Sequence, residues 1–409
     1  MGSYEPIVCE PKQSFKTPWI ETPLVESACL SRAAGCRIFL KLENVQPSGS
    51  FKSRAMGNQI LSHLYKPENA GRPVHFYASS GGNAGLAAVC AARSLGYPCT
   101  VVVPTSTKPL MNFFEAVIMK KSSGNDENVA KIALHPFDNE PIWQGNSTII
   151  DELEKQLPPA ANAEEEEVYR GRALPLDAVL CSVGGGGLLN GLVMGLEKRR
   201  PQKLQNAPAT TKPINILAIE TDGTDSLAAA IASNSLVSLP KITSQATSLG
   251  AIRVSETTFQ YAVAPPPGIK VHSAVLTDAE AARGCLRLVD DERFLVELAC
   301  GVCIEAAIGD AATATPASAN PVAVGQSPKK RKRGSNDTGH RDEGYGDDRL
   351  SSTENDNETD PEPEAESKMK QLIPDLNENS RVVIVVCGGS NVTIETAGEW
   401  RKLLAEGWV

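Results

Sequence analysis

The chain has 409 residues, of which 41% are hydrophobic and 22% charged, close to the averages of soluble globular proteins. This composition excludes a wholly disordered or collagen-like chain, and no apolar run approaches the ~20 residues that a membrane helix requires. The net charge of −9 gives no sign of a nucleic-acid partner. At about 150 residues per domain, the length predicts two or three domains.

Ten cysteines are scattered along the chain, most of them inside apolar stretches. This use of cysteine is typical of reduced thiols in the cytosol or nucleus rather than of a disulfide framework. The first twelve residues also lack the basic segment followed by an apolar segment that marks a secretory signal. We therefore expect a cytoplasmic protein that does not enter a membrane.

Outside residues 310–366, which have a different composition, the chain alternates between short apolar runs and helical patterns. The apolar runs predict buried strands at 37–42, 74–78, 100–103, 178–183, 214–220 and 382–387. Helices are predicted at 54–61, 83–95, 187–198, 225–232, 278–290 and 394–406. This alternation indicates an α/β fold with parallel sheets, in which ligands bind at the carboxyl ends of the strands. Loops rich in Gly, Ser and Asn follow three of these strands, and we expect the chemistry there.

Lys52 stands in the sequence PSGSFKSR at 47–54, after a Ser/Gly turn and at the start of a predicted helix. A lone loop lysine is usually a solvated surface charge. A lysine that forms a Schiff base must instead lose its proton near neutral pH, which desolvation and a nearby positive dipole favour. The motif alone leaves both interpretations open.

The loop SSGGNAG at 79–85 joins a predicted strand to a predicted helix. It is typical of a plain glycine-rich turn with a Ser or Asn cap, and taken alone this interpretation is favoured. The alternative is an anion-binding loop, in which backbone N–H groups and Ser hydroxyls hold a carboxylate. Asn83 would then supply a neutral amide donor.

Four consecutive glycines, Gly184 to Gly187, lie between a predicted buried strand and an apolar helix. They leave backbone N–H groups uncovered at a helix N-terminus, where the helix dipole favours an anion. The loop matches neither the Walker pattern nor the dinucleotide fingerprint. A flexible linker fits poorly between a buried strand and an apolar helix, so we predict phosphate binding.

Cys387 ends the last predicted strand, directly before Gly-Gly-Ser-Asn. Most buried cysteines are inert small hydrophobic residues, but a thiol at this position could face a ligand ring. Cys300 and Cys303 have CxxC spacing without a second pair or a nearby histidine, and we expect a structural role for them.

Together and in this order, these motifs resemble those of the serine/threonine dehydratase family of pyridoxal-5′-phosphate (PLP) enzymes, which have the tryptophan-synthase-β-type fold. The resemblance includes Glu-Thr-Asp-Gly at 220–223 and covers most of the chain outside 111–135 and 310–366. It implies two open twisted parallel-sheet domains with PLP in the cleft between them. The large domain would comprise 1–54, 147–309 and 367–409, and the small domain 55–146.

The resemblance implies a role for each motif. Lys52 would hold PLP as a Schiff base and remove the substrate α-proton, while Phe51 would pack on the pyridine ring and Asn83 would hydrogen-bond its hydroxyl. The phosphate would bind at Gly184, Gly185, Gly186 and Gly187, and the pyridine nitrogen would face Cys387. The substrate carboxylate would bind at Ser79, Ser80, Gly81 and Gly82.

A monovalent cation, K⁺, is also implied by the resemblance. Its ligands would be Glu220, Thr224 and the backbone carbonyls of Leu249 and Ala251. Taken alone, Glu220 at a strand end is equally well explained as a helix cap or an ion-pair partner. The family further implies an amino-acid substrate and a homodimer.

Cys387, together with a chain that stops soon after Asn391, resembles the catabolic serine dehydratases. The expected reaction is β-elimination of L-serine to pyruvate and ammonia, with conversion of L-threonine to 2-oxobutyrate as a side activity. Three alternatives remain: a threonine dehydratase, a β-replacing enzyme of the same fold, and a catalytically impaired relative that binds ligands or regulates.

Two segments depart from the family pattern. The interval from Val103 to Pro136 is too short for the helix, strand and helix expected there, so we predict a small domain shortened around 111–135, with an unpaired sheet edge. Residues 310–366 carry 7 Lys/Arg and 13 Asp/Glu but no Phe, Trp or Ile, which predicts a disordered charged insertion. Its basic cluster at 329–333 resembles a nuclear-import signal, although a solvated charge run is the plainer interpretation.

Overall fold

Two sheets organise the computed structural model, which describes residues 14–103, 129–200, 212–309 and 366–409. The larger sheet has six strands in the order β1-β2-β9-β6-β7-β8, and the smaller has three in the order β4-β3-β5. All neighbouring strands are parallel except β1, which runs antiparallel to β2. The α/β class with two parallel-sheet units is therefore confirmed.

The strands of the larger sheet are β1 (Leu24–Glu26), β2 (Arg37–Lys41), β6 (Ala178–Ser182), β7 (Ile214–Thr221), β8 (Ile269–Leu276) and β9 (Arg381–Val385). Those of the smaller sheet are β3 (Val74–Ala78), β4 (Cys99–Val101) and β5 (Ala130–Leu134). The central strands β6 and β9 are buried along their whole length, as their continuous apolar sequences predict.

Helices cover both sheets. They are α1 (Ala28–Ala34), α2 (Lys52–Leu64), α3 (Asn83–Ser94), α5 (Glu140–Gln156), α6 (Ala163–Tyr169), α7 (Gly187–Arg199), α8 (Ser226–Ala232), α9 (Glu256–Val263), α10 (Asp278–Arg287), α11 (Leu298–Ile308), α12 (Lys368–Leu372) and α13 (Ile394–Ala405). Every residue of α11 is buried, because this helix is apolar on all sides and packs against α10 and the larger sheet.

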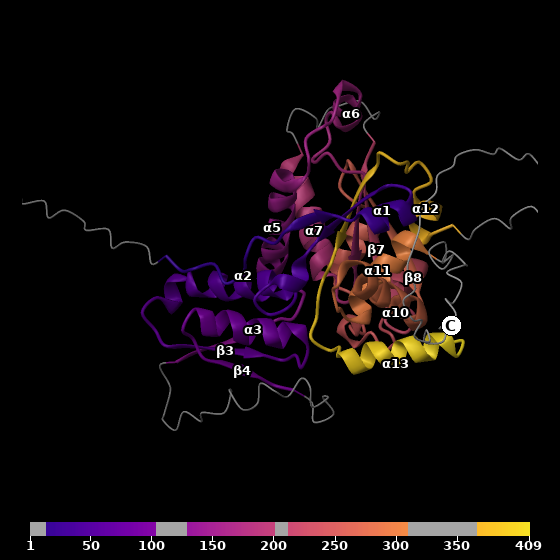
Figure 1. The fold of residues 1–409 in the computed structure, drawn as a ribbon. Coiled ribbons are helices and arrows are strands. Elements are labelled where there is room, and N and C mark those ends of the chain that lie inside the picture. Colours follow the sequence, from indigo (N-terminus) through magenta and orange to yellow (C-terminus); the bar gives the residue numbers. More distant parts are fainter. Residues whose placement is uncertain (1–13, 104–128, 201–211, 310–365) are drawn as a thin grey trace, which may run out of the picture.

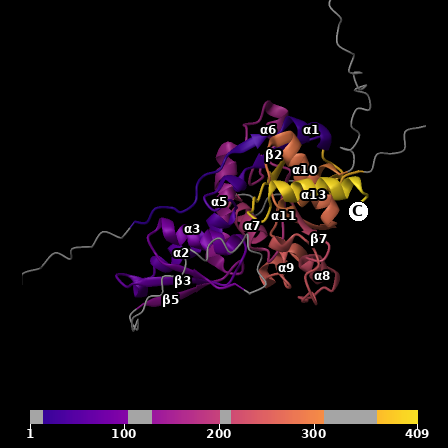
Figure 2. The same ribbon diagram turned by 60° about the horizontal axis from the view of Figure 1, so that its bottom comes forward.

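Figure 1 shows the two lobes that result. Helices α2 and α3 lie with β3 and β4 in one lobe, and α10, α11 and α13 gather around β7 and β8 in the other. Helix α5 packs against both α2 and α7 and so joins the lobes, a division that Figure 2 keeps after a 60° turn. Each lobe has its own cluster of buried apolar side chains.

The predicted elements agree with the structure where the sequence signal is continuous. All six predicted strands and all six predicted helices are present within a few residues of their expected ends. Strands β1, β5 and β8 and helices α1, α5, α6, α9 and α12 were not predicted. Strand β8 has the sequence IKVHSAVL, in which polar residues interrupt the apolar run that marks a buried strand.

The stretch 111–135, predicted to be shortened, is only partly described. Its end forms β5, which pairs in parallel with β3 along five residues, so these residues complete the smaller sheet. Residues 104–128 lie outside the described part of the chain, as do the insertion up to 365 and its basic cluster. Positions 54 and 146, the predicted domain limits, fall inside α2 and α5, so these limits stay predictions.

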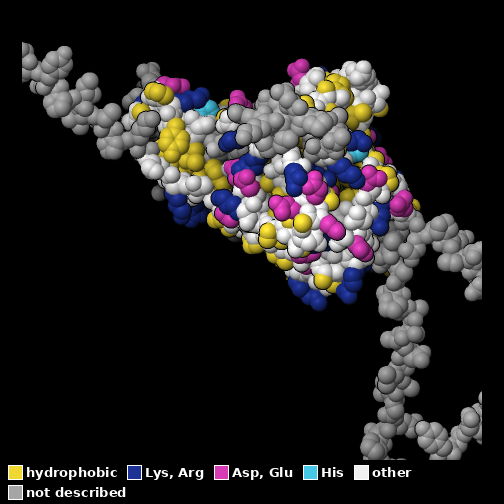
Figure 3. Space-filling model, turned by 90° about the horizontal axis from the view of Figure 1, so that it is seen from above, with side chains coloured by type: hydrophobic (Ala, Val, Ile, Leu, Met, Phe, Trp, Pro, Cys, Tyr) yellow, Lys and Arg dark blue, Asp and Glu magenta, His cyan; other side chains and the backbone are white. Residues whose placement is uncertain are grey.

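The surface carries charges of both signs. Figure 3 shows basic and acidic side chains interspersed over the described part of one face. Within the described residues, no helix combines the length and the hydrophobicity needed to cross a bilayer.

Candidate active site

A cavity of about 260 Å³ lies between the two lobes, at the carboxyl ends of β3, β6 and β9. Most of the predicted site residues line it: Phe51, Lys52, Ser79, Ser80, Gly82, Asn83, Gly184, Gly185, Gly186, Gly187 and Cys387. Leu249 and Ala251, predicted as cation ligands, also line it, whereas Gly81, Glu220 and Thr224 do not. The fold thus brings motifs from distant parts of the sequence to one cavity.

Lys52 is the first residue of α2, and its amino group points to the backbone of the other wall of the cavity. Its Nζ donates to the carbonyl of Pro136 at 3.1 Å and lies 5.1 Å from the centre of the Phe51 ring. It forms no ion pair with a carboxylate of the described residues. Burial without such a partner lowers the pKa of Lys52 to about 8. A substantial fraction of the amine is therefore neutral, and nucleophilic, near physiological pH.

The start of α2 is fixed from two sides. The Phe51 N–H donates to the carbonyl of Cys387 at 3.2 Å, and Ser50 forms an isolated antiparallel bridge with Gly388. The lysine loop and the end of β9 are therefore held together by backbone contacts. These contacts set Lys52 and Cys387 on the same cavity wall.

A buried charge network lies behind the lysine and escaped the sequence analysis. The guanidinium of Arg54 donates to Glu43 at 2.7 Å and to Glu152 at 2.5 Å, and Lys41 donates to Glu152 at 2.5 Å. Two cations and two carboxylates balance one another, with Lys41, Glu43 and Arg54 fully buried. The network ties the first turn of α2 to β2 and α5, and so anchors the helix that carries Lys52.

The four-glycine loop leaves no room for side chains at its centre. Gly186 has φ +92°, and a Cβ there would lie 1.9 Å from the Thr258 hydroxyl. A Cβ on Gly185 would lie 2.2 Å from the Phe137 ring. Helix α7 begins at Gly187, so the loop presents a helix N-terminus to the cavity. This arrangement suits a phosphate group.

Asn83 begins α3 and reaches across the cavity to the other lobe. Its Nδ2 donates to Glu297 at 3.1 Å, and its Oδ1 accepts from the Ser390 N–H at 3.2 Å. Glu297 also lines the cavity and was not singled out from the sequence. The signal that could have found it is a lone carboxylate directly before the apolar helix α11.

Cys387 is 5% exposed, and its Sγ lies 3.6 Å from the Ser182 hydroxyl. Burial raises the pKa of this thiol to about 11, so it is protonated at neutral pH. Cys300 and Cys303 are also buried, and burial raises their pKa well above the usual value for a thiol. The nine cysteines in the described residues are all free.

Glu220 caps a helix. Its two carboxylate oxygens accept the N–H groups of Leu227 and Ala228, each at 2.8 Å, at the start of α8. Burial raises the pKa of Glu220 to about 8. The Thr224 hydroxyl lies 2.7 Å from that of Thr221. The cap is one of the two plain explanations that the sequence left open for Glu220, and the cation site stays a prediction.

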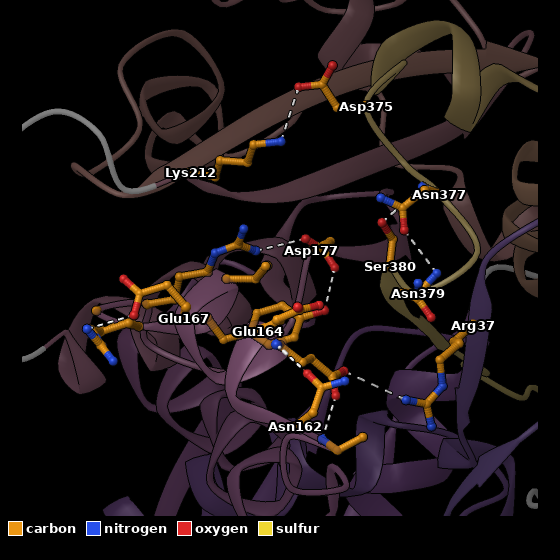
Figure 4. A pocket seen from close by; sticks show the side chains of 17 residues that line it. Arg37, Asn162, Glu164, Glu167, Asp177, Lys212, Asp375, Asn377, Asn379 and Ser380 are labelled. Carbon is orange, nitrogen blue, oxygen red and sulfur yellow. Dashed lines mark hydrogen bonds and ion pairs between the residues drawn. The ribbon is translucent and has the colours of Figure 1, made fainter.

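A second, larger cavity of about 780 Å³ lies at the opposite, amino ends of β2, β6 and β9 (Figure 4). All four of its basic side chains are ion-paired: Arg37 with Glu26, Arg170 with Glu167, Arg172 with Asp177 and Lys212 with Asp375. It contains none of the predicted site residues. Its size alone therefore does not make it the reactive site.

The smaller cavity fits a cofactor that carries an aldehyde, a phosphate and an aromatic ring. Lys52 supplies an amine with a lowered pKa, the glycine loop supplies N–H donors at a helix N-terminus, and Phe51 supplies an aromatic face. An α/β fold with such a lysine between two parallel-sheet lobes defines a class of lysine-dependent cofactor enzymes.

Comparison with known proteins names the family. A family model described as "Pyridoxal-phosphate dependent enzyme" matches residues 16–324, and the chain belongs to this family. It is 35% identical over 309 residues to L-serine dehydratase of Saccharomyces cerevisiae (strain AWRI1631), covering 70% of this chain and 84% of that protein. It is 36% identical over 302 residues to L-serine dehydratase/L-threonine deaminase of Mus musculus, covering 70% and 82%.

A solved structure supports the same fold. The fungal L-serine ammonia-lyase from Rhizomucor miehei superposes with a TM-score of 0.64 at 24% sequence identity, covering 95% of this chain and 99% of that one. This similarity concerns the fold.

Proposed function

We propose that the chain is an L-serine ammonia-lyase. It removes the α-proton and the β-hydroxyl of L-serine as water, and a water molecule then hydrolyses the resulting aminoacrylate to pyruvate and ammonia. The observation that carries the proposal is Lys52, a lysine with a lowered pKa that lies with the four-glycine loop and Cys387 in one cavity. The names of the yeast and mouse relatives support serine as the substrate.

Bound PLP supplies an electron sink that stabilises negative charge at the substrate α-carbon. In the proposed reaction, Lys52 holds the cofactor and then takes the α-proton on its Nζ, for which a pKa of about 8 is well placed. Phe51 would cover one face of the ring, and the N–H groups of Gly184–Gly187 would bind the phosphate. Asn83 would donate to the ring hydroxyl.

Cys387 faces the pyridine nitrogen in this proposal. Because its thiol stays protonated and is a weak hydrogen-bond donor, it does not hold the ring nitrogen in the protonated state. Compared with an aspartate, Cys387 would leave the ring a milder electron sink, which would suit elimination.

The substrate carboxylate binds at the loop Ser79–Gly82 in this proposal, where α3 begins. Three of the four residues line the cavity, and the Gly82 N–H donates to the Ser80 hydroxyl at 3.4 Å, a weak bond that a carboxylate can replace. Gly81, which is not a lining residue, contributes only backbone N–H in the proposal.

We also propose a K⁺ site at Glu220, Thr224 and the carbonyls of Leu249 and Ala251. A buried carboxylate that pairs with no cation of the described residues supports it. The test is thermal unfolding and activity in K⁺ against a large organic cation. A K⁺ effect that disappears in Glu220→Gln supports the site, and equal behaviour in both salts contradicts it.

A homodimer and a cytoplasmic location complete the proposal. The nine cysteines of the described residues are all free, which supports a reducing compartment. Analytical ultracentrifugation of the full chain tests the dimer, and a sedimentation coefficient of a 43.5 kDa monomer at micromolar concentration contradicts it.

The decisive experiment is an absorption spectrum of the purified protein before and after L-serine is added. We expect a band near the visible edge, its loss in Lys52→Ala, and pyruvate formation with serine. Folded protein that lacks this band even with added PLP contradicts the enzyme assignment and favours an impaired relative.

Threonine dehydratase is the second candidate, because the mouse relative is named for both activities. Comparison of kcat/KM for L-serine and L-threonine separates the two. A higher value with threonine, with 2-oxobutyrate as product, would favour the second candidate.

A further inference from the structure

Glu297 is the one carboxylate that lines the proposed active-site cavity, among the described residues. It is 5% exposed and stands at the N-cap of α11. Its backbone carbonyl accepts the N–H of Cys300 at 2.8 Å, so the backbone begins the helix while the side chain is free for other contacts. Glu297 forms no ion pair with a described Lys, Arg or His.

Three segments converge on this carboxylate. Oε1 accepts the Asn391 N–H at 2.6 Å, and Oε2 accepts the Ser248 hydroxyl. Both oxygens accept from Asn83 Nδ2, at 3.1 and 3.3 Å. Asn83 belongs to the lobe of the smaller sheet and the other donors to the lobe of the larger one. The carboxylate therefore joins the lobes at the cavity.

The Asn83 amide is held at both ends by these contacts. Its oxygen accepts from the Ser390 N–H, and one N–H of the amide is used by Glu297. The other N–H has only the Ser248 hydroxyl at 3.3 Å, and that hydroxyl already donates its proton to Glu297. The long contact to Ser248 is the one that an oxygen of a bound ring replaces at least cost.

Gly389 gives independent support for a built contact. It has φ +118°, and a Cβ at this position would lie 2.2 Å from the Glu297 carboxyl carbon. The loop after β9 can approach the carboxylate so closely only because residue 389 has no side chain.

We propose that Glu297 is a positioning residue: its carboxylate holds the Asn83 amide across the cleft so that one amide N–H is directed to the ring hydroxyl of the cofactor. The inference rests on the proposed function of Asn83. In this proposal, the orientation of the cofactor depends on Glu297, which is 214 positions from Asn83 along the chain.

Glu297→Gln tests the proposal with little change of shape. The Glu297 carboxylate accepts every hydrogen bond that it forms through its side chain. A glutamine has an NH2 group in place of one oxygen, so this group would face at least one donor that needs an acceptor. In full-length protein freed of PLP, we expect the Kd for added PLP to rise about tenfold, which corresponds to about one strong hydrogen bond. We also expect a changed ratio of the ultraviolet and visible absorption bands of the bound cofactor.

The coupling to Asn83 is the stringent part of the test. If Glu297 acts through Asn83, Glu297→Gln changes the PLP Kd less than twofold in the Asn83→Ala background. Additive effects of the two substitutions, or an unchanged Kd and spectrum in Glu297→Gln, overturn the proposal. Because PLP binding is measured without serine, its result is independent of whether serine is the substrate.

Two further variants separate positioning from folding. Glu305→Gln removes another buried carboxylate, which belongs to α11 and does not line the cavity. Arg283 contacts this carboxylate at 2.7 Å. We expect it to lower thermal stability but to leave the PLP Kd and spectrum unchanged. Ser248→Ala removes a donor to Glu297 without removing a charge, and carries the test if Glu297→Gln does not fold. We expect Ser248→Ala to weaken PLP binding, and we expect this effect to disappear in the Asn83→Ala background. If the effects of Ser248→Ala and Asn83→Ala on the Kd are additive, the result counts against the proposal.

Discussion

The two cavities of this protein lie at opposite ends of the same central strands and differ in how their charges are satisfied. The larger one, of about 780 Å³, is lined by basic side chains that are each paired with a carboxylate (Figure 4). The smaller one, of about 260 Å³, contains Lys52, which has no such partner among the described residues, and a glycine loop at a helix N-terminus. We therefore place the reactive site in the smaller cavity, because it has an unpaired lysine and free backbone N–H groups, and not in the cavity of larger volume.

The difference has a physical cause. Parallel strands direct the N-termini of the following helices to the carboxyl edge of a sheet, where backbone N–H groups are left for a ligand. At the amino edge, charged side chains must satisfy one another. Arg381 shows this, because its buried guanidinium contacts Glu165 at 2.7 Å and the carbonyl of Pro159 at 3.0 Å. The amino edge is therefore built as a structural layer.

The largest effect is expected in the smaller cavity. Lys52→Ala removes the amine that we propose to hold the cofactor and to take the proton, so kcat/KM with L-serine should fall by at least about 10³-fold. Steady-state pyruvate formation measures it, with circular dichroism to verify folding. Retention of more than a tenth of the activity would move the catalytic role away from Lys52.

A change beside the larger cavity should affect stability instead, at Arg381, which does not line the cavity but pairs with Glu165, which does. Arg381→Met leaves Glu165 without its buried partner, and the free energy of unfolding should fall by about 3 kcal/mol. Urea unfolding measures the loss, and kcat per folded molecule should stay within twofold of the original value. A large loss of kcat in folded protein would show that the two cavities are coupled.

The lowered pKa of Lys52 predicts a pH-dependent cost in protein that lacks PLP. Lysine has a pKa near 10.4 in the unfolded chain and about 8 in the fold, so the unfolded state binds more protons between these values and stability rises with pH there. The penalty is fully present below pH 8. Lys52→Met should therefore stabilise this form by about 3 kcal/mol at pH 7, and by progressively less from pH 8 to 10. A gain that does not depend on pH would assign the effect to packing.

The smallest effect is expected at the exposed pair of the larger cavity. Lys212 and Asp375 are 3.5 Å apart, and their side chains are 65% and 77% exposed. Lys212→Ala should change the free energy of unfolding by less than about 0.5 kcal/mol and leave kcat unaltered. It is the matched control for Lys52→Ala, since both remove a cavity lysine. A loss of activity in Lys212→Ala would contradict a purely structural role for this cavity.

Local patterns made much of the fold predictable. Strand β3 was predicted with its observed bounds, Val74–Ala78, because a buried strand must be apolar and its ends are marked by turn residues. The start of α7 at Gly187 was predicted because the four glycines separate an apolar strand from an apolar helical pattern. In contrast, β5 and β8 carry no continuous apolar run and gain their stability from pairing with neighbouring strands.

The sequence by itself determined the α/β class, because apolar runs and helical patterns alternate along the chain. It also singled out Lys52, the four-glycine loop and Cys387, because each of these stands in a short local motif. Only the tertiary structure decided which distant groups meet them. Arg54 pairs with Glu152 across 98 positions, and Asn83 with Glu297 across 214. A buried charge carries no local signature, since its free energy depends on a partner that folding alone brings within hydrogen-bonding distance.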